Sequence, residues 1–220
     1  MVSDRESRAG VVAAIERTGV IAILRAGTED HLVRVAEVLL EEGLDCIEVT
    51  ATTPAALTTV QHLTSRLPAA FLGVGTVIAR PQAERAVASG ARYLVTPSTE
   101  RAVIDVAAEH DLPVIAGALT PTEIVAARRF GADVVKVFPI GAVGGLEYIH
   151  AVRGPLPDAP LAPTGGVALG DVEAYLRAGC TCVGLGSPLL GDALAGGSLA
   201  GLRARARRVV AAVSAARGRP

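Results

Sequence analysis

The sequence predicts an α/β fold, a (β/α)8 TIM barrel with an extra N-terminal helix, in a single domain over residues 1–220. Three observations support this. The length suits one barrel with a full core. Half of the residues are hydrophobic but only 3% are aromatic, which is typical of helices packed on a buried parallel sheet. Eight apolar segments alternate with amphipathic ones, whereas a doubly wound open sheet, the alternative, usually has fewer strands.

The predicted strands are short runs rich in β-branched residues. They are residues 20–25, 46–50, 71–76, 93–97, 114–117, 134–138, 161–165 and 183–186. The predicted helices have apolar residues at helical spacing, and include residues 5–18, 29–42, 54–66, 81–89, 99–110 and 120–130. Glycines that precede a strand by a few residues are expected as helix C-caps: Gly43, Gly90, Gly131 and Gly179.

The charge balance points to small-molecule partners. The net charge is −1 at pH 7, so we expect no nucleic acid and no anionic membrane surface as partner. The chain begins with mixed charges, and no apolar run approaches membrane-spanning length, which favours a cytoplasmic protein. The basic stretch at residues 202–208 is expected to be the solvated face of a C-terminal helix.

The cysteines and histidines do not suggest a reactive cluster. Three cysteines are too few and too poorly spaced for a disulfide framework or a zinc site, so Cys46, Cys180 and Cys182 are expected as buried thiols. The histidines lie in helix-like segments, and we expect structural or exposed positions for all four: His31, His62, His110 and His150.

Lys136 is the only lysine beside twenty arginines, and it lies in an apolar run of residues 134–138. Arginine keeps its proton, whereas a desolvated lysine can lose it and attack a ketone to form a Schiff base. The alternative is a lysine at a strand end that extends its ammonium to solvent. The sequence favours the functional interpretation.

Glu48 is the second unusual charge, a lone carboxylate in a strand expected to be buried on both faces. Across a barrel, Glu48 and Lys136 would face each other and supply a nucleophile and a general acid/base. A structural ion pair between the two is the alternative.

Reaction sites of such barrels lie at the carboxyl ends of the strands, and anions often bind after strands seven and eight. Gly165, Gly166 and Gly186 offer backbone N–H groups at these two positions, and Ser187 adds a hydroxyl. These residues therefore predict a phosphate site, with tight-turn glycines as the alternative.

Six motifs occur in order along residues 20–190: Ile47-Glu48-Val49-Thr50, Gly73-Val74-Gly75-Thr76-Val77, Thr96-Pro97, Val135-Lys136-Val137-Phe138-Pro139, Pro163-Thr164-Gly165-Gly166-Val167 and Gly184-Leu185-Gly186-Ser187. In this the chain resembles the KDPG/KHG aldolase family, class I enzymes acting on 2-keto-3-deoxy-6-phosphogluconate or 4-hydroxy-2-oxoglutarate. The resemblance implies Lys136 as the Schiff-base lysine and Glu48 as the general acid/base. It also implies a homotrimer that needs no metal and no other cofactor. The remaining implied contacts are Thr76, Pro97, Phe138 and Thr164 at the pyruvate end, and Gly165, Gly166, Gly186 and Ser187 at the phosphate.

One position departs from the family pattern. Many members carry an arginine four residues after the glutamate, where it helps to bind substrate, and this chain has Thr52 there. Arg25 matches an arginine that other members have at the end of strand one, and it is expected to bring a guanidinium to the same opening. Substrate preference is therefore expected to depend on Arg25 and Thr52.

The expected reaction is cleavage of a 2-keto-3-deoxy sugar acid, or its phosphate, to pyruvate and an aldehyde. Three alternatives remain open. A phosphosugar isomerase or epimerase would use other acid/base groups, and the strand ends carry no histidine. A metal-dependent aldolase would need several ligands at the strand ends. A non-catalytic sugar-phosphate binder would tolerate arginine at position 136.

Overall fold

The computed structural model describes residues 7–218, and within them eight parallel strands form one sheet. The sheet order is β7-β6-β5-β4-β3-β2-β1-β8. The two ends of this order meet where Thr164, just after β7, bridges to Gly184 of β8. The strands are β1 (Val20–Leu24), β2 (Cys46–Thr50), β3 (Phe71–Gly75), β4 (Tyr93–Val95), β5 (Val114–Ala118), β6 (Val134–Val137), β7 (Leu161–Pro163) and β8 (Val183–Leu185). The barrel prediction is confirmed.

Closure of the barrel depends on a glycine in β8, Gly184. A Cβ atom on Gly184 would lie 2.4 Å from Oγ1 of Thr164. Glycine at this position therefore lets β7 and β8 approach each other closely.

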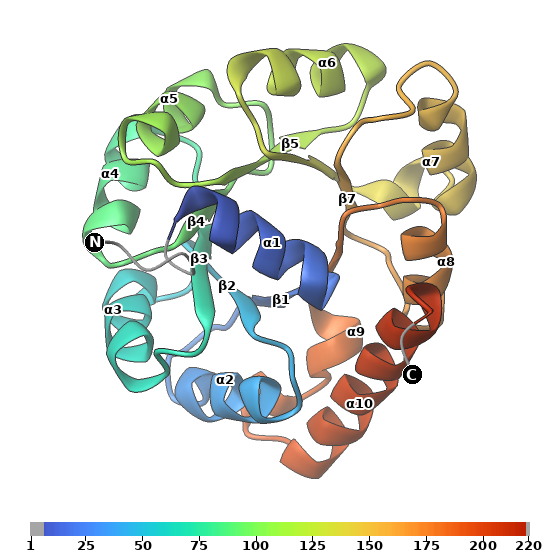
Figure 1. Cartoon of the computed structure of the whole chain (residues 1–220). Coiled ribbons are helices and arrows are strands. Elements are labelled where there is room, and N and C mark those ends of the chain that lie inside the picture. Colours follow the sequence, from blue (N-terminus) through green and yellow to red (C-terminus); the bar gives the residue numbers. More distant parts are fainter. Residues whose placement is uncertain (1–6, 219–220) are drawn as a thin grey trace.

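Helices surround the sheet (Figure 1), and each predicted helix is present with ends shifted by at most three residues where it is described. Outside the barrel lie α2 (Leu32–Glu41), α3 (Ala56–Arg66), α4 (Arg80–Ala88), α5 (Arg101–Glu109), α6 (Pro121–Phe130), α7 (Leu146–Arg153), α8 (Val172–Arg177) and α10 (Leu199–Ala216). After β8 come the short α9 (Ser187–Leu190) and a 3-10 turn, η4 (Ala193–Ala195). The four predicted cap glycines all have φ between +82° and +104°.

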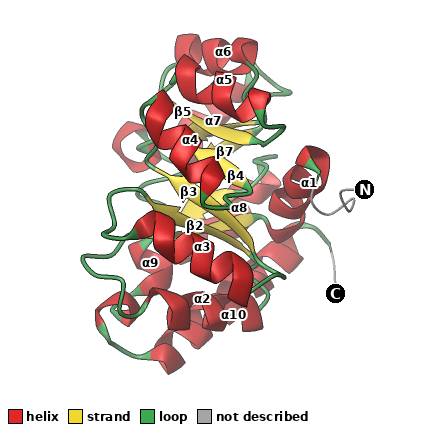
Figure 2. Cartoon of the chain, turned by 90° about the vertical axis from the view of Figure 1, so that its left-hand side faces the viewer, coloured by secondary structure: helices red, strands yellow, loops and turns green. Residues whose placement is uncertain are grey.

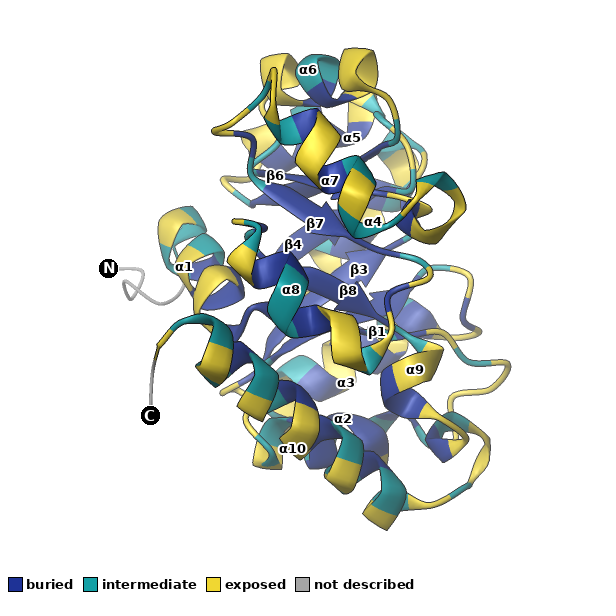
Figure 3. Ribbon diagram, turned by 90° about the vertical axis from the view of Figure 1, so that its right-hand side faces the viewer, coloured by how far each residue is buried: buried dark blue, intermediate teal, exposed yellow. Residues whose placement is uncertain are grey.

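Side chains of each strand alternate between two apolar layers, as the pleat requires. Outward residues such as Val20, Ala22 and Leu24 pack with the helices, and inward residues such as Ile21 and Phe71 fill the barrel. Figure 3 shows the strands as a continuous buried layer, and Figure 2 shows the sheet between its helices. The inward positions nearest the carboxyl ends are the ones that form the site.

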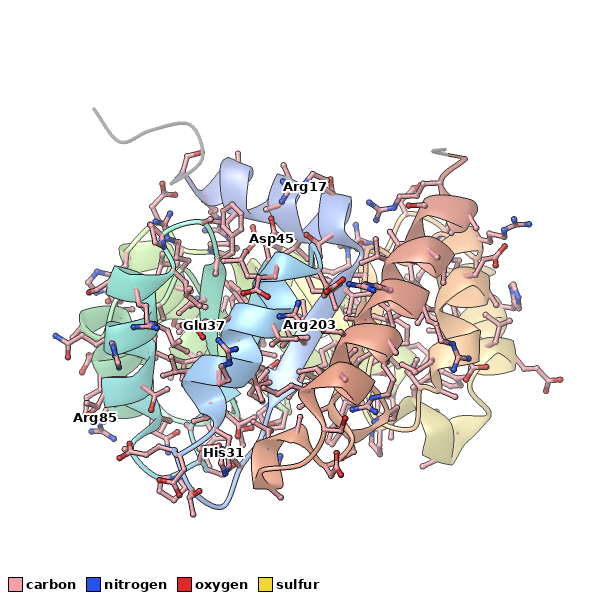
Figure 4. The ribbon with its side chains drawn as sticks, turned by 90° about the horizontal axis from the view of Figure 1, so that it is seen from below. Arg17, His31, Glu37, Asp45, Arg85 and Arg203 are labelled. Atoms are coloured by element: carbon pink, nitrogen blue, oxygen red, sulfur yellow. The ribbon has the colours of Figure 1, made fainter. Side chains whose placement is uncertain are left out.

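The helix α1 (Arg8–Thr18) lies across the amino-terminal end of the barrel (Figure 1). Its residues Val11, Ala14 and Ile15 are buried in the same cluster as the barrel interior. Arg17 forms an ion pair with Asp45, just before β2, and Figure 4 shows both residues on this side. The hydroxyl of Ser7 caps the helix by accepting from the N–H of Gly10 at 3.1 Å. The predicted start at residues 5 and 6 lies outside the described residues.

The predicted solvated face of the C-terminal helix is confirmed in part, since Arg207 and Arg208 are exposed but Arg203 and Arg205 are partly covered. Arg203 is 32% exposed and pairs with Glu41 of α2 and with Glu42 just after it, while Arg207, which is 70% exposed, also pairs with Glu42. The carbonyls of Leu189 and Leu190 accept from Arg205 at 2.6 and 2.7 Å. Arg203 and Arg205 therefore join α10 to the end of α2 and to α9, against which it packs. Within residues 7–218, no helix combines the length and the apolar character needed to cross a membrane.

Candidate active site

A cavity of about 390 Å³ lies at the carboxyl ends of the strands. Ten of the twelve predicted site residues line it: Arg25, Thr76, Pro97, Lys136, Phe138, Thr164, Gly165, Gly166, Gly186 and Ser187. The other two do not line it: Thr52 hydrogen bonds to the lining residue Arg25, and Glu48 lies beside Gly75, the residue before Thr76. We refer to this space as the reaction cavity.

Lys136 is the centre of the reaction cavity. It lies on β6 and is paired in register with Gly117 of β5 and Ala162 of β7. Lys136 is only 6% exposed, and its Nζ lies 5.4 Å from the ring centroid of Phe138. An amine that is buried yet lines a cavity can meet a substrate and little bulk water.

Glu48 lies on β2 with 1% of its surface exposed. Its carboxylate lies over Gly75 of β3, where a Cβ atom would come within 1.7 Å of Oε1. This Oε1 is buried, and no described residue hydrogen bonds to it. Nor does any ion pair within 4.0 Å join it to Lys136 among the described residues. The structural ion pair is therefore absent, and Oε1 of Glu48 remains a buried acceptor without a hydrogen-bond donor among the described residues.

Thr76 and Pro97 form one side of the reaction cavity. Thr76 has a φ of +61°, a conformation that costs a non-glycine residue of order 1–3 kcal/mol and that clusters at functional sites. Pro97 is held by a buried threonine, because Oγ1 of Thr96 accepts from the N–H of Gly117 at 2.9 Å. A Cβ on Gly117 would lie 2.1 Å from the carbonyl carbon of Pro97, so glycine is needed for this approach.

The opposite side is the glycine loop, residues 164–166. Gly165 and Gly166 have φ values of +79° and +87°, and a Cβ on either would come within 2.9 Å of Phe138 or Gly141. The carbonyl of Gly165 accepts from the N–H of Gly141 at 2.9 Å. Among residues 7–218, none accepts the N–H of either loop glycine. These donors are the strongest structural support for an anion site.

Arg25 extends into the reaction cavity from the end of β1 and is held by two threonines. Its Nη1 donates to Oγ1 of Thr52 at 2.8 Å, and its Nη2 donates to Oγ1 of Thr76 at 3.2 Å. Thr52 is held in turn by Thr50, whose hydroxyl lies 3.2 Å away. Thr52 does not line the reaction cavity, so its expected direct contact with substrate is not what the structure shows. It contacts the guanidinium instead.

Sequence reasoning missed some residues of the cavity wall. Ile23, Val167 and Pro188 also line it. Their apolar side chains carry no chemical signal, although Ile23 has the inward parity of its strand and was identifiable on that basis.

The cysteines are buried thiols, as predicted. Burial raises the pKa of Cys46 and Cys182 far above the ordinary range, and it raises that of Cys180 to about 11. Within the described part of the chain, no group of three or more His, Cys, Asp or Glu side chains is close enough to hold a metal ion. The four histidines do not line the reaction cavity.

Comparison with known proteins decides the family. The model of the KDPG and KHG aldolase family matches residues 11–199. The chain belongs to this aldolase family. It is 35% identical over 200 residues, 90% of this chain and 92% of the relative, to a probable 2-dehydro-3-deoxy-6-phosphogalactonate aldolase of Rhizobium meliloti. It is 32% identical over 166 residues to the 2-dehydro-3-deoxy-phosphogluconate aldolase of Treponema pallidum, covering 76% of this chain and 79% of that one.

One solved relative holds a covalent reaction intermediate. The KDPG aldolase of Legionella pneumophila was crystallised with pyruvate captured at low pH as a covalent carbinolamine intermediate. It superimposes with a TM-score of 0.82 at 29% identity, over 90% of this chain and 97% of that one. As a member of the KDPG and KHG aldolase family, the chain described here is an aldehyde-lyase.

Proposed function

We propose that the chain is a class I aldolase that reversibly cleaves a phosphorylated 2-keto-3-deoxy sugar acid to pyruvate and an aldehyde. Buried Lys136 in the reaction cavity carries the proposal, because it is the one amine that the cavity wall supplies. The carbinolamine captured in the Legionella pneumophila relative supports the same chemistry.

The reaction starts when the neutral amine of Lys136 attacks C2 of the keto acid and water leaves. The resulting iminium withdraws electrons from the neighbouring bond. Glu48 takes the proton of the C4 hydroxyl, the C3–C4 bond breaks, and the aldehyde departs. The electron pair remains as an enamine, which receives a proton at C3. Water then hydrolyses the imine, releasing pyruvate and the free amine.

Two anion sites orient this substrate. Arg25 binds the carboxylate next to the ketone, because its guanidinium is held at the cavity wall by Thr76 and Thr52. The N–H groups of Gly165 and Gly166, with the hydroxyl of Ser187, bind the phosphate at the other end.

Whether the enzyme cleaves both C4 epimers of the substrate can be measured directly. Relatives are named for phosphogluconate and for phosphogalactonate substrates, which differ in configuration at C4. We propose a 2-keto-3-deoxy-6-phosphohexonate as the substrate class, and pyruvate release from the two epimers measures the preference.

The test of the mechanism is reductive trapping. The protein is incubated with pyruvate, reduced with borohydride and digested for mass spectrometry. We expect a pyruvate adduct on Lys136 and none in Lys136→Arg, since arginine cannot supply a free amine. A wild-type protein without an adduct overturns the proposal, and so does an adduct on any other residue.

We also propose a homotrimeric, cytoplasmic enzyme. The family resemblance supports the trimer, and a 29% identical structural neighbour belongs to a cage designed by fusing symmetric oligomeric domains. Light scattering on the eluted protein would give three times the 22.4 kDa chain mass.

A further inference from the structure

Arg205 is an arginine of α10 that forms no ion pair within the described part of the chain. The arginines two positions away on the same helix, Arg203 and Arg207, both pair with carboxylates at the end of α2. Arg205 instead donates to the backbone of α9, from Nε to the carbonyl of Leu189 at 2.6 Å and from Nη2 to that of Leu190 at 2.7 Å. Figure 1 shows α9 beside α10. Two charge-assisted bonds from one planar group fix both the place and the orientation of this backbone.

The peptide groups that Arg205 binds continue the hydrogen bonding toward the reaction cavity. The peptide group after Leu189 donates its N–H to the carbonyl of Gly186 at 3.0 Å. The peptide group after Leu190 donates its N–H to the carbonyl of Ser187 at 2.8 Å. Successive hydrogen bonds of this kind polarise and strengthen one another. Arg205 is therefore connected to Gly186 and Ser187 through a single peptide group in each case.

Gly186 and Ser187 line the reaction cavity together with the glycine loop. The carbonyl of Gly186 and the N–H of Ser187 belong to the same peptide group. No residue in the range 7–218 accepts this N–H. The chain of hydrogen bonds that begins at Arg205 thus ends at a backbone donor in the cavity wall, next to the Ser187 hydroxyl.

Two glycines leave the space that the guanidinium occupies. A Cβ atom on Gly191 would lie 2.5 Å from Nη2 of Arg205, and one on Gly201 would lie 3.1 Å from Nη1. Gly191 also has a φ of +57°, which favours glycine. Lysine has a single ammonium and no planar fork, so it does not match both carbonyls as arginine does. The surroundings of position 205 therefore suit arginine specifically.

We propose that Arg205 is a positioning residue for the phosphate end of the substrate. It does not line the reaction cavity, and it acts through α9, which it holds so that Gly186 and Ser187 meet a phosphate at the glycine loop. The pyruvate end is formed by other elements, chiefly β1, β3 and β6, and is expected not to depend on Arg205. This inference rests on the proposed function. It adds a residue of an outer helix to the specificity for phosphorylated substrates.

The experiment measures the two ends of the site separately in Arg205→Gln. For 2-keto-3-deoxy-6-phosphogluconate we expect KM to rise about tenfold with kcat changed less than about twofold, because the lost bonds support binding before and after the C3–C4 bond breaks. Inhibition by inorganic phosphate is expected to weaken by a similar factor. Exchange of the pyruvate methyl protons for deuterium, followed by NMR, reports on the Lys136 end alone and is expected to stay within about twofold of the wild type.

Arg203→Gln is the matched control, because it removes an arginine of the same helix that pairs with carboxylates and does not contact α9. We expect it to leave KM, phosphate inhibition and pyruvate exchange within about twofold of the wild type. Arg205→Lys keeps the charge and the stem, and we expect a smaller rise in KM, about threefold. It decides the question if Arg205→Gln does not fold.

Unchanged KM and unchanged phosphate inhibition in every folded Arg205 variant overturn the inference. An equal loss of pyruvate exchange also overturns it, because a general loss of structure would affect both ends of the site. The borohydride adduct separates the two levels. An adduct on Lys136 with no response to the Arg205 variants removes the role of Arg205 alone, whereas a wild type without the adduct removes the proposed function.

Discussion

The hydroxyl of Thr52 accepts a 2.8 Å hydrogen bond from Nη1 of Arg25, so a residue outside the reaction cavity orients the guanidinium within it. Thr52 takes the place of a family arginine and, in this chain, supports another arginine. Arg25 and Thr52 thus form one hydrogen-bonded unit with Thr76.

Thr52→Val keeps the shape of the side chain and removes this acceptor. We expect kcat/KM for the keto acid to fall about threefold to tenfold, near the value of one hydrogen bond of about 1 kcal/mol. The loss is expected mainly in KM, because in the proposed mechanism Arg25 binds the carboxylate before and after the bond breaks. Thr52→Ser retains the oxygen, and the prediction fails if the two variants have equal kinetics.

Glu48→Gln removes the proton acceptor but keeps the size of the side chain. We expect kcat to fall about 10² to 10⁴-fold, the usual contribution of general acid/base catalysis. The borohydride adduct of pyruvate on Lys136 is still expected to form on long incubation. Steady-state kinetics and mass spectrometry on one preparation check both parts. A variant that keeps wild-type kcat would show that another group moves the proton.

Gly75→Ala places a methyl group where the carboxylate of Glu48 lies. We expect both activity and stability to fall, with a stability loss of about 1–3 kcal/mol from overpacking. Gly73→Ala is the matched control, because its Cβ would instead meet the ring of Tyr93 at 2.2 Å. Urea unfolding and kcat are measured for both. Similar stability losses with a larger kcat loss in Gly75→Ala would agree with the prediction; a larger kcat loss in the control would contradict it.

Cys180 is expected to make the stability of the fold decrease at high pH. Burial raises the pKa of its thiol to about 11 in the folded chain, against about 8.5 for an exposed thiol. The folded state therefore holds the proton more tightly, and this stability is fully present below pH 8.5 and is lost as the pH rises to 11. From pH 8 to 10.5, we expect wild type to lose roughly 2 kcal/mol more unfolding free energy than Cys180→Ala. Parallel pH dependences in urea melts would contradict this.

The strands and their inward residues were predictable because a barrel repeats two simple periods, and Lys136 and Glu48 stand out as charges within apolar strands. The contact of Thr52 with Arg25 could not be predicted, because it depends on the side-chain conformation of Arg25 and on how the loop after β2 lies beside the end of β1. The path of residues 186–197 was also not predictable, because glycines interrupt any hydrophobic period there and Arg205 of α10 binds the carbonyls of Leu189 and Leu190.

The position of α1 has a consequence for the order of events. Its apolar face closes the amino-terminal end of the barrel, so substrate, water and products all pass through the opening at the carboxyl ends. In the proposed mechanism the aldehyde departs by that route while the pyruvate carbons are still bonded to Lys136. Hydrolytic water then enters by the same path, and pyruvate leaves last. Release is therefore sequential, and an aldehyde retained at the opening delays every later step of the turnover.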